Sequence, residues 1–444
     1  MKLIVKDNEE EIKLDGIIKR VSNKFFVELE VPMSVKLNSI IRHIKGYYSS
    51  IGNITLVNNR NLSIRGSSDD SEYSIYEYEV GYIISSHIDE DTLLINSMQL
   101  YFKEFDYFFV ENRYKLDIEN MDKQLTITQE FKTEKLFEND SLYIEYIKTA
   151  GLDKDEFGHI LFLNPSKVEI VFKEPLKLPQ IFEEITKIES CFGFVIAKKM
   201  NLIEIGVGDT EGIYHEIIAP FQKKYEEVLL SEFHIVDINS KELLKDILNN
   251  YYCNQRIAAA INMSYEYIYN DLDNILEFTS LVNTLELVLT DKSFAEDLKT
   301  YVINNNIQLK NNNERMLEIF ESLTKEQCKF IKSFYKFENV ELRDKFRYIF
   351  YIIFELKESE NSEKYISKII TTRNYYVHGG KKDNTLNNVD MLCTKYLLRD
   401  ILYVLITEIC SNNTNSLIES YKLTIPTVYE NLVKFIEKDE ENGM

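Results

Sequence analysis

One short stretch of the sequence holds residue types that can transfer a proton and bind a phosphate. It reads KIITTRNYYVHGGKKDN (368–384) and contains Arg373, Asn374 and His378. Histidine transfers protons near neutral pH, and the planar donors of arginine stabilise charge that develops on a phosphate. Cleavage of RNA by its own 2′-OH requires these two roles, because the RNA itself then supplies the nucleophile. Asn374 is placed to orient either partner or a phosphate oxygen.

The spacing of the pair has two explanations. Five residues rotate an ideal helix by about 500°, so the two side chains would lie about 140° apart on a regular helix. Gly379 and Gly380 can end the helix directly after His378, and the long Arg373 side chain can then reach the imidazole. Alternatively, His378 only complements the dipole at the helix end and Arg373 is a solvated surface residue. The spacing alone leaves both interpretations open.

Several lysines accompany the pair in an otherwise acidic chain. The net charge of the protein is −21, which disfavours extended non-specific binding of nucleic acid and leaves room for a local basic site. We expect Lys368, Lys381 and Lys382 to form that site with the pair. Lysines on a loop are commonly only solvated, so their contribution carries less weight than the Arg–His pair.

Other kinds of site have little support in the sequence. The remaining histidines are far apart and the five cysteines form no CxxC pair, so we expect neither a metal site nor a cofactor. The segment GVGDTEG (206–212) lacks the Lys-Ser/Thr of a phosphate-binding loop. Scattered thiols, a charged start and the absence of a long apolar run predict a cytoplasmic protein without a membrane segment.

The first half of the chain has the alternation that is typical of β-strands. KFFVELEVP (24–32) and KVEIVF (167–172) are examples, and several such short strands predict a sandwich or a partly open barrel. One helix is expected at 178–192 within this half.

The second half follows a period of 3.6 residues from about residue 240, which predicts a helical bundle. Thr324 and Gln327 form a capping-box pattern. A closing helix is expected at 386–410, with an apolar stripe toward the core made of Val389, Leu392, Cys393, Tyr396, Leu397 and Val404. The predicted class is α+β, with a sandwich-like β-rich domain (1–235), a helical connector (236–270) and an all-α bundle (271–444).

These features together resemble a known family. RNYYVH resembles the R-N-x-x-x-H form of the signature of HEPN domains, all-α bundles found in prokaryotic RNases of defence and toxin systems. A helix containing LVNTLELVL, the intervening helices, the motif, its glycine turn and the closing helix are similar to the Apea-like HEPN group over 270–420. The segment VGYIISSHIDEDTLLINSMQLYFKEFDYFF (80–109) is similar to the ApeA N-terminal domain.

The resemblance implies that Arg373 and His378 are catalytic, with Asn374 as their polar helper and Glu286 as a candidate for an acidic position on the first bundle helix. It implies a metal-independent endoribonuclease that cleaves host RNA in bacterial antiviral defence (abortive infection), with tRNA as a candidate substrate. A homodimer through the helical domain would join two Arg–His pairs, and the N-terminal domain would respond to a phage-derived trigger. The alternative is a non-catalytic protein that dimerises through the bundle and binds a ligand through the β-rich domain.

Overall fold

The protein forms two compact units in the computed structural model. The β unit comprises Met1–Glu189 and Met200–Phe233, and the helical unit comprises Ser190–Lys199 and His234–Met444. The residues that the structure describes are 1–7, 10–21, 24–49, 51–66, 72–105, 114–119, 124–129, 133–148, 151–154, 160–163, 166–222, 240–267, 273–291, 294, 297–298, 301, 340–379, 382–411 and 416–442.

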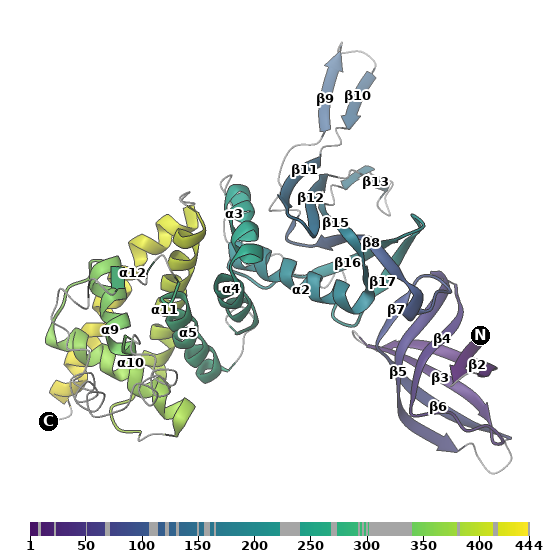
Figure 1. Ribbon diagram of the computed structural model, residues 1–444, viewed down its shortest axis with the longest axis horizontal. Helices are drawn as coiled ribbons and strands as arrows, with labels where there is room; N and C mark the ends of the chain where they lie inside the picture. Colours follow the sequence, from purple (N-terminus) through teal and green to yellow (C-terminus); the bar gives the residue numbers. More distant parts are fainter. Residues whose placement is uncertain are drawn as a thin grey trace, which may run out of the picture. The chain divides into compact units, whose positions relative to one another are not determined.

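The first six strands form a closed antiparallel barrel in the order β5-β4-β1-β2-β3-β6, in which β6 also pairs with β5 (Figure 1). Closure depends on the long strand β5, which pairs with β4 through residues 52–60 and with β6 through residues 60–66. Within β5, Asn58 has a positive φ of 56°. The strands are β1 (Lys2–Asp7), β2 (Glu10–Val21), β3 (Lys24–Pro32), β4 (Ile40–Tyr48), β5 (Gly52–Gly66) and β6 (Tyr73–Val80).

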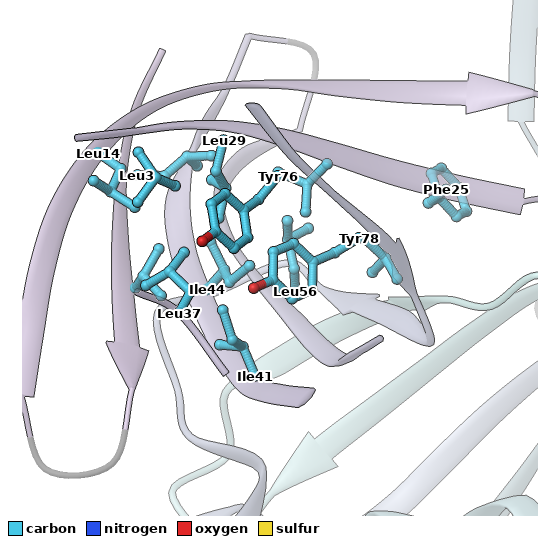
Figure 2. Packing of buried hydrophobic residues seen from close by; sticks show 14 of the residues in the cluster. Leu3, Leu14, Phe25, Leu29, Leu37, Ile41, Ile44, Leu56, Tyr76 and Tyr78 are labelled. Carbon is cyan, nitrogen blue, oxygen red and sulfur yellow. The ribbon is translucent and has the colours of Figure 1, made fainter. Parts of the chain in front are cut away.

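Alternate side chains of these strands fill the barrel with apolar groups (Figure 2). Leu3, Leu29, Ile44 and Leu56 are fully buried there. Tyr78 is also buried, and its hydroxyl donates a 2.8 Å hydrogen bond to the carbonyl of Asn38. Burial raises the pKa of Tyr78 to about 12, so the barrel interior contains a neutral phenol whose donor is satisfied.

The sheet continues beyond the barrel in the order β7-β17-β16-β8-β15-β12-β11. These strands are β7 (Tyr82–Ile84), β8 (Leu94–Phe102), β11 (Thr133–Glu138), β12 (Leu142–Lys148), β15 (Ser166–Lys177), β16 (Leu202–Asp209) and β17 (Tyr214–Ile218). The pairs β9 (Tyr114–Glu119) with β10 (Gln124–Gln129), and β13 (Gly151–Lys154) with β14 (Ile160–Leu163), form two small sheets. A 3-10 turn, η1 (Glu90–Thr92), precedes β8, and helix α2 (Leu178–Val195) follows β15.

The helical unit contains the elements that carry the Arg–His motif. Helix α5 packs against α4, α10 and α11, and α10 also packs against α9 and α12. The described elements are α3 (Ser240–Cys253), α4 (Gln255–Tyr267), α5 (Asn274–Val288), α9 (Leu342–Arg347), the π-helical turn η3 (Tyr348–Ile353), α10 (Glu360–His378), α11 (Asn388–Cys410) and α12 (Ser416–Asn442).

The α+β class is confirmed, and the β-rich part contains a closed barrel rather than a sandwich. The helices expected at 178–192 and 386–410 are present as α2 and α11. The capping-box pattern of Thr324 and Gln327 lies outside the described residues. The three-part division at 235 and 270 stays a prediction.

The apolar stripe expected on α11 is wrong in part. Leu397 and Val404 are buried, but Val389 is 69% exposed and Tyr396 is 45% exposed, while Leu392 and Cys393 are half-buried. The buried face includes polar residues instead. Thr394 accepts a 2.9 Å hydrogen bond from the Tyr365 hydroxyl, and Lys395 binds Glu277 at 2.6 Å and Asn274 at 2.9 Å. Partners on α10 and α5 make these polar positions compatible with the core.

The Lys395–Glu277 pair joins α11 to α5, and both residues are buried. We predict that Lys395→Met lowers the free energy of unfolding by about 3–5 kcal/mol, because it leaves the Glu277 carboxylate buried without its cation. Urea denaturation of the full chain measures this loss. The double variant Lys395→Met/Glu277→Leu removes both charges and should recover most of the stability. A single variant as stable as the wild type would contradict the assignment.

Candidate active site

Helix α10 presents the motif at its C-terminal end. The helix starts at a capping box in which Ser359 and Ser362 satisfy each other's backbone N–H groups. It stays helical through His378, and Gly379 then takes the left-handed conformation with φ 69° and ψ 36°. The Gly379 N–H donates to the Tyr375 carbonyl at 3.0 Å. The glycine therefore ends the helix directly after His378, as the sequence suggests.

The structure brings the Arg373 and His378 side chains into direct contact. Arg373 Nη1 lies 3.1 Å from His378 Nε2. A guanidinium group only donates hydrogen bonds, so Nε2 is the acceptor in this contact and the proton of the neutral imidazole lies on Nδ1. Arg373 is 18% exposed at its side chain, whereas His378 is exposed. The pair thus has an anchored cation and an accessible proton-transfer group.

Two asparagines hold the guanidinium group. The amide oxygen of Asn283, on α5, accepts hydrogen bonds from Arg373 Nε at 3.2 Å and Nη2 at 3.0 Å. The amide oxygen of Asn374 accepts one from Nη1 at 3.1 Å. Because arginine cannot accept, both amides must present their oxygens to it. Arg373 is therefore oriented from two helices, α5 and α10.

Glu286 adds a negative charge beside this group. It lies one turn beyond Asn283 on α5, and its Oε2 is 4.0 Å from Arg373 Nη2. Its other oxygen, Oε1, accepts a 3.1 Å hydrogen bond from the buried ammonium of Lys345, on α9. Glu286 therefore accepts a hydrogen bond from Lys345 and forms a longer ion pair with Arg373.

The expected lysines are less closely associated with the pair. Lys368 lies five residues before Arg373 on α10, and its carbonyl accepts the hydroxyl of Thr372 at 2.7 Å. Among the described residues, Lys368 makes no side-chain hydrogen bond to Arg373 or His378. Lys382 is exposed on the loop before α11, and Lys381 lies outside the described residues. Their contacts with RNA stay a prediction.

The other described histidines belong to the β unit. His215 is buried and pairs with Asp209 at 2.9 Å, His87 Nε2 lies 2.7 Å from the Gly46 carbonyl, and His43 is buried. Burial lowers the pKa of His43. His159 and His234 lie outside the described residues. Within the described part of the chain, no three His, Cys, Asp or Glu side chains gather as metal ligands.

Sequence reasoning missed Asn283. Its helix was identified through LVNTLELVL, but nothing in the sequence links Asn283 to a residue 90 positions later. The available signal was the spacing of Asn283 and Glu286, which places two polar groups on one face of a mostly apolar helix.

Comparison with known families places both halves of the chain. A family model described as ApeA N-terminal domain 1 matches residues 6–251, which is more than half of the chain. The chain belongs to this family. A second model, described as Apea-like HEPN, matches residues 292–414 and includes Arg373, Asn374 and His378. The resemblance inferred from the sequence is therefore confirmed.

The ApeA and HEPN families are associated with antiviral defence nucleases, and HEPN domains are generally ribonucleases that commonly dimerise. Comparisons with curated proteins and with solved structures gave no significant match. None of the helices that the structure describes is long and apolar enough to cross a bilayer.

Proposed function

We propose that this protein is a metal-independent endoribonuclease of the HEPN type that cleaves host RNA in bacterial antiviral defence, with tRNA as a candidate substrate. The observation that carries the proposal is the 3.1 Å contact between Arg373 Nη1 and His378 Nε2 at an exposed helix end. This contact lies inside the segment that matches the Apea-like HEPN model. It joins a fixed cation to a group that transfers protons near neutral pH.

The proposed reaction is transesterification. The RNA 2′-oxygen attacks the neighbouring phosphorus, a P–O2′ bond forms and the P–O5′ bond breaks, which leaves a 2′,3′-cyclic phosphate and a 5′-OH. His378 Nε2 takes the proton of the 2′-OH, and a protonated imidazole delivers a proton to the departing 5′-oxygen. Arg373 stabilises the negative charge that develops on the two non-bridging oxygens.

Substrate binding in this scheme rearranges the hydrogen bonds of the pair. In the free protein, the Nε2 lone pair of His378 accepts from Arg373 Nη1 and is not available as a base. A phosphate oxygen competes for Nη1, and its binding releases Nε2 to accept the 2′-OH proton. Asn283 keeps its bonds to Nε and Nη2, so Arg373 stays in place during the exchange.

We further propose that the active form is a homodimer through the helical unit. One pair offers one imidazole, whereas the reaction needs both a base and an acid, and a second copy supplies the other. The Leu386 N–H donates to the hydroxyl of Thr372, the residue before Arg373, at 2.8 Å, which brings the chain back to α10 just before α11 begins. The exposed Val389 and Tyr396 follow on α11. Such an apolar face suits an isologous contact with a second copy.

The β unit has a regulatory role in this proposal: it recognises a phage-derived trigger and controls the cleavage by the helical unit. The competing function is a non-catalytic protein in which the bundle only dimerises and the β unit only binds a ligand. Cleavage by the purified wild-type chain distinguishes the two.

We predict that His378→Ala and Arg373→Ala each reduce cleavage of purified total RNA at least 100-fold. Removal of the histidine eliminates proton transfer, and removal of the arginine eliminates charge stabilisation. Arg373→Lys should also lose most activity, because an ammonium cannot reproduce the planar fork. Lys364→Ala, on the same helix nine residues earlier, is the matched control and should cleave normally. Wild-type rates in either alanine variant would refute the catalytic assignment.

The ends of the RNA fragments give a second prediction. Cleavage should continue in excess EDTA and produce cyclic or 3′-phosphate ends with 5′-OH ends, because the 2′-OH route needs only proton transfer and electrostatic stabilisation. Mass spectrometry of the fragments identifies the ends. Loss of activity in EDTA with recovery on adding Mg²⁺ would contradict this mechanism.

The dimer makes a third prediction for this site. Val389→Glu should yield a monomer that cleaves RNA at least tenfold more slowly, because the new charge lies on the apolar face. Val389 is in the first turn of α11, where a carboxylate is compatible with the helix dipole, so the fold should survive. Leu423→Glu, at an exposed apolar position of α12, is the control. Sedimentation measures the mass, and a wild-type monomer with full activity would disprove the shared site.

A further inference from the structure

We infer that Asn283 is a positioning residue that fixes the orientation of Arg373, an inference that rests on the proposed function. One oxygen, Asn283 Oδ1, accepts from both Nε at 3.2 Å and Nη2 at 3.0 Å of the guanidinium group. A single acceptor that bridges these two atoms covers one complete edge of the planar group. The group cannot rotate about its last bonds without losing both hydrogen bonds.

The covered edge determines which donors remain for the substrate. A guanidinium group has five N–H donors in a rigid fork. Asn283 uses the Nε–Nη2 edge, and Nη1 points to the exposed Asn374 and His378. The Nη1 donors therefore lie on the exposed side beside His378, where a phosphate can reach them, whereas Nη2 also lies 4.0 Å from Glu286 Oε2. Asn283 acts through Arg373, and no atom of Asn283 needs to touch the RNA.

A neutral amide suits this task better than a carboxylate does. A carboxylate bound directly to Arg373 would hold it equally well but would cancel the charge that the phosphate requires. Glu286, the nearby acid, stays 4.0 Å away and binds Lys345 at 3.1 Å. The site thus holds its arginine through an uncharged acceptor, while the adjacent carboxylate forms only a longer ion pair with Arg373 and hydrogen-bonds to Lys345.

Helix α5 is a rigid support for this contact. Asn283 is half-buried between the buried residues Val282 and Thr284, and the buried Glu277–Lys395 pair fixes the first turn of α5 to α11. Asn283 also lies outside both family matches, which cover 6–251 and 292–414. Its assignment comes from the contact alone.

The test compares three single variants of the full-length protein. Asn283→Ala and the similarly sized Asn283→Leu remove the acceptor, and Asn283→Asp keeps an oxygen at the same place. Leu276→Ala, at an exposed position of the same helix, is the control. We expect the first two to lower kcat about 10- to 100-fold with KM changed less than threefold, because a misoriented Arg373 fails mainly in the transition state. Asn283→Asp holds Arg373 in place but reduces its effective charge, so its kcat should lie between that of Asn283→Ala and that of the wild type.

The orientation of the Arg373 side chain is measured separately by NMR of its Nε–H group. The Nε–H signal is assigned by its absence from the spectrum of Arg373→Lys. We expect slow exchange with water in the wild type and in Asn283→Asp, and at least tenfold faster exchange in Asn283→Ala with an unchanged melting temperature. Equal exchange in wild type and Asn283→Ala would overturn the inference, as would an unchanged kcat. A wild-type protein that cleaves no RNA would refute the proposed function, while the exchange rates still decide whether Asn283 holds Arg373.

Discussion

The hydrogen bonds between Asn283 and Arg373 are the constraint on which the site depends. They join α5 to α10, two helices separated by 90 residues at this contact. They place a permanent positive charge beside an exposed imidazole. A long side chain at a helix surface normally samples many rotamers, and holding it costs conformational entropy. The two hydrogen bonds to a charged group offset that cost, so the cation is already oriented when a substrate arrives.

The end of α10 satisfies a second requirement. His378 is the last helical residue, and the left-handed Gly379 turns the chain away immediately afterwards. A residue with a side chain would be strained at this φ. The turn leaves the imidazole accessible, while the Leu386–Thr372 hydrogen bond returns the chain to α10 for the start of α11. Gly379 thus serves to expose the histidine as well as to stop the helix.

Local sequence patterns predicted much of this organisation. The strand at 24–32 and the helix at 178–192 follow from apolar periodicity. The Arg–His contact was one of two arrangements that residue chemistry and the adjacent glycines allowed. The barrel closure was not predictable, because it depends on β5 pairing with β4 and β6 at once. The contacts of Asn283 and Lys395 were not predictable for the same reason, because their partners are distant in sequence. The prediction of the apolar stripe on α11 was wrong where hydropathy assigned Tyr396 to the core, because Lys395 is buried instead.

The central claim is that Arg373 and His378 promote attack by the RNA's own 2′-OH. The most direct measurement is cleavage of a synthetic RNA in which only the nucleotide 5′ to a mapped cut carries a 2′-deoxy sugar, compared with the all-ribose strand. Our account predicts that the modified bond stays intact while other sites in the same strand are cut at their usual rates. Cleavage of the 2′-deoxy bond at the normal rate would show that water or another nucleophile attacks, and would contradict the mechanism.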